Sequence, residues 1–239
     1  MTTRRGGVSA SPFDSMNVRD GLGDEPSAVA RNQALLADAI GVPPLYLNQV
    51  HGCRVVRLSE LDTYGEAPPI EADASVTTER GIACAIQVAD CLPVLMAAPG
   101  GVAAAHAGWR GLAAGVLEAT LAALCEATGC APAAVEVWLG PCIGARRFEV
   151  GDDVRRAFVP EPGAAPGLAS APQTLRFAPL GNGKWLADLP LLARDRLAAA
   201  GVVSISGGTW CTVEDASRFF SFRRDRITGR MVAAIWLRG

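Results

Sequence analysis

Two histidines, His51 and His106, are the side chains best suited to chemistry, and they are the only two among 239 residues. Glycine follows each closely, in the pentapeptide Asn48–Gly52 (NQVHG) and in the run His106–Gly111 (HAGWRG). A glycine permits an unusual backbone turn and leaves room for a ligand to approach the imidazole ring. Both histidines also stand where apolar runs end, so we expect each of them at the end of a strand.

A thiol and a carboxylate interrupt the apolar sequence between the two histidines, in the run Val88–Pro93 (VADCLP). Two imidazoles and one thiolate suit Zn²⁺, so His51, Cys91 and His106 are candidate zinc ligands. Three protein ligands leave a fourth position open, which is typical of an ion that binds water or polarises a substrate atom. Because the three residues belong to separate segments, their spacing alone does not establish the site.

Two other interpretations of these residues stay open at this point. Both histidines could be hydrogen-bonded turn residues, with Cys91 as a core thiol, since free cysteine is often buried. Alternatively, Cys91 could be a nucleophile with His106 as its base, as in a cysteine hydrolase or amidase. Metal analysis distinguishes the zinc site from the cysteine hydrolase, because a Cys91 that binds zinc is not a free thiolate.

Charged residues near these motifs are candidates for catalysis and substrate binding. Asp90 lies in an apolar run, where a carboxylate is costly unless it is hydrogen-bonded or functional, and we expect it to orient a ligand or accept a proton. Arg110 follows His106 by four residues near a predicted helix start, and its planar fork suits phosphate. A second basic group stands beside three aromatic rings on which a base could stack: Arg223, Arg224, Arg226 and Arg230 beside Phe219, Phe220 and Phe222.

Hydrophobic patterning predicts the strands that must position these residues. Three short and nearly continuous apolar runs, at 81–88, 92–98 and 101–106, are typical of central strands covered on both faces. Further strands are predicted at Leu45–Val50, Val135–Leu139, Val202–Ser206 and Met231–Leu237. The elements do not alternate as strict βαβ units, which favours an α+β fold, namely a single-domain sandwich of mixed sheets over residues 1–239.

Three helices are expected to pack on these strands, at Pro26–Ile40, Leu112–Ala127 and 189–200. Asp24 is expected to cap the first helix and Gly41 to end it. Asp188 is expected to cap the third helix. The segment Pro160–Pro172 is rich in Gly, Ala and Pro and is predicted to be an exposed loop.

Composition excludes several classes of protein. With 50% hydrophobic residues the chain is too apolar to be disordered, and a net charge of −2 predicts no binding to nucleic acid or an anionic membrane. Seven scattered cysteines without a CxxC pair favour a reducing compartment. The longest apolar tract, Gly81–Gly108, contains Asp90 and is therefore not a bilayer span. We expect a cytoplasmic protein, either a monomer or a small homo-oligomer.

Nine segments spread over nearly the whole chain carry a likeness to a known family. They are Arg5–Ser9, Met16–Asn17, Gly23–Pro26, Asn48–Gly52, Ala72–Ala74 with Thr77, Val88–Pro93, His106–Gly111, Leu139–Gly144 and Phe219–Arg230. In this order they resemble the YfiH-type family, whose members are called laccase-domain or polyphenol oxidase proteins and also purine nucleoside phosphorylases. The combination of VHG, ADC-x-P and HAGWRG is the specific part of the likeness.

The resemblance implies a fold similar to a bacterial toxin deamidase domain, with His51, Cys91 and His106 as ligands of Zn²⁺. It also implies phosphate-dependent cleavage of the glycosidic bond of adenosine, inosine and 5′-methylthioadenosine, with some adenosine deamination. The partners would then be a nucleoside and phosphate.

Asn48 and Met16–Asn17 lie where other members of the family vary, and Arg19–Asp20 replaces a less charged stretch, which leaves the substrate preference open. We expect Asp90 and Arg110 to act in catalysis, and Asn48, Arg110 and Arg223 to bind substrate.

The laccase label is a further alternative. A multicopper oxidase holds several copper ions largely through imidazoles, and two histidines cannot supply such a set. Cu²⁺ bound by the same three residues is therefore the weaker alternative to Zn²⁺. A non-enzymatic binding module is also disfavoured, because the sequence has neither a basic stripe nor an amphipathic targeting helix.

Overall fold

A computed structural model of the chain describes residues 1–63, 69–158 and 176–238. Its centre is a mixed sheet of six strands in the order β11-β7-β5-β6-β3-β2. These strands are β2 (Val55–Arg57), β3 (Ala74–Thr77), β5 (Leu92–Ala98), β6 (Gly101–Ala107), β7 (Glu136–Leu139) and β11 (Ser204–Gly207). The pairs β11–β7 and β2–β3 are parallel, and the other pairs are antiparallel.

A second, smaller sheet covers one face of the central sheet. It consists of β1 (Pro44–Leu45), β4 (Ala83–Val88) and β12 (Met231–Trp236), with β4 in the middle. Ile86 of β4 and Ala104 of β6 belong to one buried cluster, which fills the space between the two sheets. Cys91 lies where the chain crosses from β4 of the small sheet to β5 of the central sheet.

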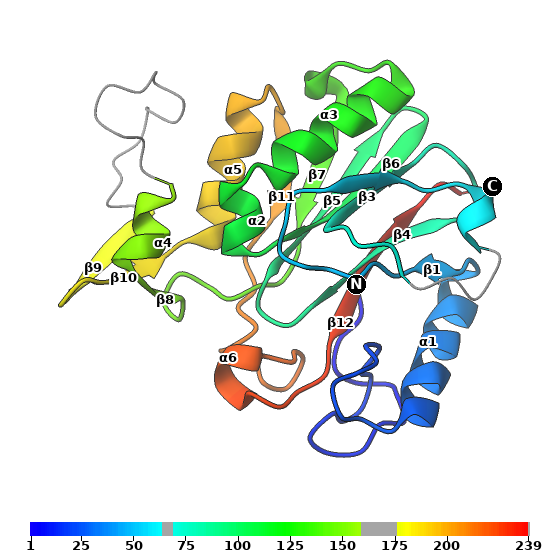
Figure 1. Cartoon of the computed structure of the whole chain (residues 1–239), viewed down its shortest axis with the longest axis horizontal. Helices are drawn as coiled ribbons and strands as arrows, with labels where there is room; N and C mark the ends of the chain where they lie inside the picture. Colours follow the sequence, from blue (N-terminus) through cyan, green and yellow to red (C-terminus); the bar gives the residue numbers. More distant parts are fainter. Residues whose placement is uncertain (64–68, 159–175, 239) are drawn as a thin grey trace.

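Helices cover both outer faces of this pair of sheets (Figure 1). Helices α3 (Val116–Thr128) and α5 (Leu189–Ala199) pack on the central sheet, where Ala103 and Ala105 of β6 meet Leu117 and Leu121. Helix α1 (Pro26–Ile40) covers the small sheet through Leu36, Ala85 and Val232. Neighbouring residues of β6 point to opposite faces, and both faces are buried. The uninterrupted apolar runs of the sequence therefore correspond to strands covered on both sides, as predicted.

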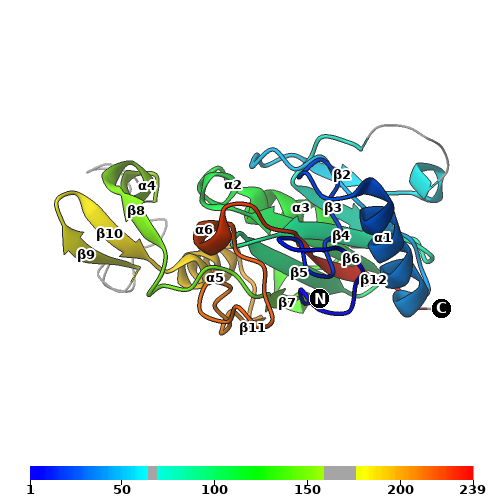
Figure 2. The ribbon, with the colours of Figure 1, turned by 90° about the horizontal axis from the view of Figure 1, so that it is seen from below.

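A third sheet projects at one end of the molecule, away from α1 (Figure 2). It contains β8 (Glu149–Gly151), β10 (Lys184–Ala187) and β9 (Phe177–Gly181) in this order, and α4 (Asp152–Arg156) follows β8. The remaining short elements are η1 (Glu60–Thr63), α2 (Trp109–Ala113), η2 (Pro132–Ala134) and α6 (Phe222–Asp225). Mixed sheets packed with helices confirm the α+β prediction.

One predicted helix is wrong in its extent. The segment Leu112–Ala127 is not continuous, because α2 ends at Ala113 and α3 begins at Val116. Gly115 between them adopts a φ of 94°, a left-handed conformation that interrupts the helical hydrogen bonds. Helix α2 is therefore a separate short helix directly after β6, the strand that carries His106.

Two other details differ from the sequence prediction. The strand predicted at Leu45–Val50 is limited to Pro44–Leu45, because the backbone N–H groups of Val50, His51 and Gly52 bind the carboxylate of Asp73 instead of another strand. Asp24 does not cap α1. The N-cap residue is Glu25, which makes no side-chain cap, whereas Oδ2 of Asp24 accepts hydrogen bonds from Ser9 and Asn17.

The predicted C-terminal residue that ends α1 and the predicted N-terminal cap of α5 are confirmed. Gly41 ends α1 in a left-handed conformation, and the side chain of Asp188 accepts a hydrogen bond from the N–H of Leu191 at the start of α5. The loop predicted at Pro160–Pro172 lies outside the described residues. Within the described ranges, no helix combines the length and the apolar character needed to cross a membrane.

Candidate functional site

The structure brings His51, Cys91 and His106 together from three separate segments. One potential ligand atom of each lies within 4.8 Å of those of the other two. Sγ of Cys91 is 3.8 Å from Nε2 of His51, and the two imidazole rings meet edge to face with centroids 4.8 Å apart. An imidazole–thiolate–imidazole set at this separation fits a divalent ion of borderline softness and leaves a fourth ligand position. The group could therefore hold a metal ion.

Strand pairing accounts for the meeting of Cys91 and His106. Strands β5 and β6 are antiparallel, with Leu92 opposite Ala107 and Pro93 opposite His106. Cys91 therefore lies directly before a strand whose partner carries His106. The backbone at two positions is unusual, since His51 has a φ of 64° and Asp90 a φ of 89°. Such angles are uncommon outside glycine and occur preferentially at functional sites.

Asp73 is the buried residue that organises this group. Its fully buried carboxylate is 2.7 Å from Nδ1 of His106 and accepts hydrogen bonds from the backbone N–H groups of Val50, His51 and Gly52. A carboxylate only accepts hydrogen bonds, so Nδ1 of His106 carries the proton and Nε2 is left to bind a ligand. One side chain thus sets the tautomer of His106 and shapes the loop that carries His51.

Two glycines of the HAGWRG run are required by close packing. A Cβ atom on Gly108 would lie 2.9 Å from Cδ2 of His51 and 3.0 Å from Sγ of Cys91. A Cβ atom on Gly111 would lie 2.7 Å from the carbonyl oxygen of Gly52. These contacts are too short for real Cβ atoms, so the two glycines let α2 pack directly against the three candidate ligands.

The charges of the site favour a thiolate beside an imidazolium in the protein without an ion. Burial alone would raise the pKa of Cys91, but the charge of His106 and hydrogen bonds from both histidines outweigh it and lower the pKa to about 6. Burial alone would lower the pKa of His106, but Cys91 and Asp73 raise it to about 9. Burial would raise the pKa of Asp73, but hydrogen bonds from His106 and Gly52 hold it below its ordinary value. The thiolate is the form that binds metal.

The three residues open into a cavity of about 460 Å³, a volume suited to a small organic ligand. Its wall combines apolar side chains with four arginines. The apolar lining includes Leu22, Ile143, Phe148, Leu189 and Phe222, and the arginines are Arg19, Arg110, Arg223 and Arg230. Within the described part of the chain, none of the four guanidinium groups forms an ion pair with a carboxylate. The cavity therefore offers unneutralised positive charge to an anion.

Arg19 and Arg230 are the two members of this set whose pKa is changed by burial. Burial lowers the pKa of both groups, and the charge of Arg19 adds to the lowering at Arg230. Two like charges close to each other and partly removed from water are costly unless an anion is placed between them. In the sequence, Arg19 stands out only as part of a departure from the family.

Two buried glutamines support Arg19, and both line the cavity. The amide of Gln49 exchanges hydrogen bonds with the backbone N–H and C=O of Gln87, so its side chain takes the place of a strand partner for this residue of β4. The side chain of Gln87 donates to the carbonyl oxygen of Val18 and accepts from Nη1 of Arg19. A glutamine inside the buried strand β4 was the signal in the sequence that could have indicated this arrangement.

Of the other predicted site residues, three line the cavity and one does not. Asp90, Arg110 and Arg223 all line the cavity. Both carboxylate oxygens of Asp90 accept hydrogen bonds, one from the hydroxyl of Thr212 at 2.5 Å and one from the backbone N–H of Arg223 at 2.6 Å. Asn48 is exposed and is not among the residues that line the cavity. Gln49, its neighbour, lies there instead.

Comparison with protein families gives one match over almost the whole chain. Residues 1–238 match the family described as multi-copper polyphenol oxidoreductase laccase. The chain is 46% identical over 243 residues to a purine nucleoside phosphorylase of Pseudomonas aeruginosa, covering 99% of this chain and 92% of that protein. It is also 46% identical over 240 residues to the purine nucleoside phosphorylase YfiH of Escherichia coli, with the same coverage.

Solved structures agree with these sequence matches. A Neisseria meningitidis protein with 44% sequence identity superposes with a TM-score of 0.88, covering 100% of this chain and 93% of that one. A hypothetical protein YfiH of Bacillus licheniformis, with 28% identity, superposes with a TM-score of 0.90 over 99% of this chain and 91% of that one.

Proposed function

The chain belongs to the family described as multi-copper polyphenol oxidoreductase laccase, the YfiH family, and from this premise we propose that it is a zinc-dependent purine nucleoside phosphorylase. The substrates proposed are adenosine, inosine and 5′-methylthioadenosine with phosphate, and adenosine deamination is a side activity. The observation that carries the proposal is that one cavity combines the His–Cys–His group, unneutralised arginines and an apolar wall. Relatives named purine nucleoside phosphorylase support it.

Phosphorolysis exchanges one bond for another at the sugar. An oxygen of phosphate forms a bond to C1′, the bond between C1′ and the base breaks, and its electron pair leaves with the purine, which takes up a proton. Arg19 and Arg230 are suited to hold the phosphate, because planar guanidinium groups pair with its oxygens and remain charged when partly buried. Arg110 and Arg223 lie on the same cavity wall and are further candidates for the anion.

The His–Cys–His group would contribute to the reaction separately from the arginines that bind phosphate. Zinc bound there would supply Lewis-acid chemistry by polarising a substrate atom. In the neutral form of His106, which is the form that binds a metal ion, the hydrogen bond to Asp73 keeps the proton on Nδ1 and leaves Nε2 for the ion. Asp90 connects the segment of Cys91 to the loop of Thr212 and, through Arg223, to α6, which supports the cavity wall. Its assignment as a proton acceptor stays a prediction.

The test is product analysis with purified, zinc-loaded protein and inosine, in the presence and absence of phosphate. We expect hypoxanthine together with ribose 1-phosphate, and neither product without phosphate. Base release at the same rate without phosphate would indicate a hydrolase and contradict the proposal. Ammonia released from adenosine measures the deaminase activity in the same samples.

A cysteine hydrolase is the second candidate, because Cys91, His106 and Asp73 also form a thiol–imidazole–carboxylate series. A single base would suffice for such an enzyme, whereas here a second imidazole, that of His51, lies 3.8 Å from the thiol. Activity that persists after chelation and is lost on alkylation of Cys91 would favour the hydrolase. Activity that requires stoichiometric zinc would favour the phosphorylase.

A further inference from the structure

Besides the two histidines, three aromatic side chains line the cavity, and among the described residues only one of these three is exposed. Phe148 is 8% exposed, and Trp109 is half-buried with the guanidinium of Arg110 over its ring at 4.5 Å. Phe222 is 47% exposed. Phe219 and Phe220, which precede it in the sequence, are buried in the core. The cavity therefore presents the ring of Phe222 to a ligand.

The position of Phe222 is set by two caps on the short helix α6, which it begins. The backbone N–H of Arg223 donates to Oδ2 of Asp90 at 2.6 Å. The hydroxyl oxygen of Ser221 accepts from the backbone N–H of Arg224 at 3.2 Å. Because Asp90 directly precedes Cys91, the first cap connects α6 to the segment that carries the thiol of the metal-binding group.

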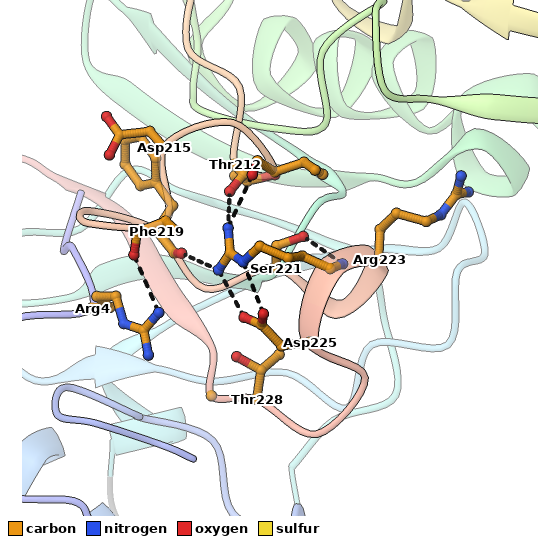
Figure 3. A network of polar contacts seen from close by, with 12 residues as sticks. Arg4, Thr212, Asp215, Phe219, Ser221, Arg223, Asp225 and Thr228 are labelled. Carbon is orange, nitrogen blue, oxygen red and sulfur yellow. Dashed lines mark hydrogen bonds and ion pairs between the residues drawn. The ribbon is translucent and has the colours of Figure 1, made fainter. Parts of the chain in front are cut away.

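The side chain of Arg224 joins α6 to the preceding loop. Figure 3 shows three of the residues that it contacts, Thr212, Phe219 and Asp225. Nη1 donates to the carbonyl oxygens of Thr212 and Val213, Nη2 donates to that of Phe219 and to Asp225, and Nε donates to Asp225. All five N–H groups of this guanidinium are thereby used. Thr212 also donates to Asp90, so the network reaches the base of the cavity.

An exposed ring held in this way is suited to stacking. Exposing a phenylalanine costs free energy that a flat ligand recovers on binding, and a ring whose backbone is already ordered loses little entropy when it binds. Its neighbours are cations, since the guanidinium groups of Arg226 and Arg230 lie 5.9 Å from the ring centroid. Purine bases are flat and aromatic, and they stack on such rings without regard to their exocyclic groups.

We propose that Phe222 is the face on which the purine base of the substrate stacks, and that Arg224 is the positioning residue that holds this face over the cavity. The inference rests on the proposed function, which supplies the purine. Stacking depends on the flat face of the base and not on the group at C6. A site that binds the base by stacking therefore accepts purines that differ at C6.

The test compares the binding of inosine and of free hypoxanthine to zinc-loaded wild-type protein and to the variants Phe222→Leu and Phe222→Tyr, by calorimetric titration. Leucine keeps apolar bulk but removes the ring, so we expect about tenfold weaker binding of both compounds. Tyrosine keeps the ring and should bind within about twofold of wild type, by the same reasoning. Phosphate binding and zinc content should not change in either variant.

A matched control is available on the same segment. Ile227 is 63% exposed and does not line the cavity, so Ile227→Ala should bind inosine as the wild type does. Arg224→Lys keeps the charge but supplies fewer donors, and we expect it to raise the KM for inosine severalfold while the KM for phosphate stays unchanged. An equal loss for both substrates would contradict the positioning role of Arg224.

Wild-type affinity for inosine and hypoxanthine in Phe222→Leu would overturn the inference, as would a wild-type protein that binds neither compound. Failure of the proposed function gives a different result. If no base is released with phosphate, but binding of inosine still depends on the ring at position 222, the stacking face is supported and only the reaction is wrong.

Discussion

At the scale of single residues, Asp73 has the greatest influence on the site although it faces no ligand. Its carboxylate replaces the strand hydrogen bonds that Val50, His51 and Gly52 would otherwise make, and it binds Nδ1 of His106. Partners of this kind, which orient a metal ligand through its second nitrogen, strongly affect metal affinity.

We predict that Asp73→Asn weakens zinc binding by about 10- to 100-fold. The amide keeps one acceptor oxygen but places an NH₂ group against donors that need an acceptor, so the variant should also lose about 1–3 kcal/mol of unfolding free energy. Competition titration with a zinc chelator and urea unfolding measure the two effects. Glu71→Gln, an exposed change two residues away, is the control. Equal zinc affinity in Asp73→Asn and wild type would show that Asp73 does not act through His106.

At the scale of secondary-structure elements, close approach and capping decide where the site residues lie. Helix α2 begins immediately after Gly108, and the absence of a side chain there lets the helix pack on His51 and Cys91. The left-handed Gly115 then separates α2 from α3. Helix α5 contributes Leu189 to the cavity wall, and Asp188 caps its start.

We predict that Gly108→Ala lowers zinc affinity at least tenfold, because the new methyl group would displace the ring of His51 or the thiol of Cys91. Overpacking of this kind also costs about 1–3 kcal/mol of stability. Gly129→Ala is the control: it forces a left-handed angle on alanine at the end of α3, where a Cβ atom meets nothing. The control should lose about 1 kcal/mol of stability and keep its zinc affinity. A similar zinc affinity in both variants would contradict the packing argument.

The cap of α5 gives a prediction with a defined pH dependence. Burial raises the pKa of Asp188, although the hydrogen bond from Leu191 opposes it. A raised pKa in the folded state means that the folded protein binds the proton more tightly, so this group's contribution to stability falls as pH rises just above the ordinary carboxyl pKa. Asp188→Asn should therefore cap the helix as well as aspartate does, without the fall in stability as pH rises. Asp188→Ala should lose about 1 kcal/mol of unfolding free energy, because it removes the cap.

Urea unfolding of the three proteins between pH 4 and pH 7 measures this dependence. The difference in unfolding free energy between Asp188→Asn and wild type should grow in favour of asparagine as pH rises. A difference that stays constant over this range would show that Asp188 does not titrate differently in the folded and unfolded states.

At the scale of the whole molecule, the metal-binding group connects the two stacked sheets. His51 follows β1 of the small sheet, Cys91 lies at the crossover between the sheets, and His106 belongs to β6 of the central sheet. An ion bound by all three therefore binds the folded chain and not the unfolded one, and it must stabilise the fold.

We predict that zinc at 100 times its dissociation constant adds about 2.7 kcal/mol of stability. For a chain of this size that corresponds to a rise in Tm of roughly 5–10 °C, which differential scanning calorimetry with and without a chelator can measure. Cys91→Ser should show a much smaller rise. If Cys91→Ser and wild type gained the same Tm with zinc, the three residues would not bind the ion together.

Much of the fold was predictable from the sequence because its signals are local. The apolar runs that became β4, β5 and β6 are buried on both faces, and Gly41 and Asp188 end and begin helices as their chemistry requires. The rarity of histidine and the interrupted run around Cys91 likewise singled out the three residues that meet. Residue type made these residues candidate metal ligands, because few side chains bind such ions, but only the structure showed that they meet.

Only the tertiary structure decided what surrounds that group. Nothing near His51 in the sequence indicates Asp73 as its partner, and Arg19 meets Gln87 across 68 positions. The tertiary structure also shows that Phe222 is exposed whereas its neighbours Phe219 and Phe220 are buried, and that Asn48 lies outside the cavity. The physical reason is that a residue's chemistry belongs to the residue, whereas its distance to another depends on strand order and sheet stacking, to which the entire chain contributes.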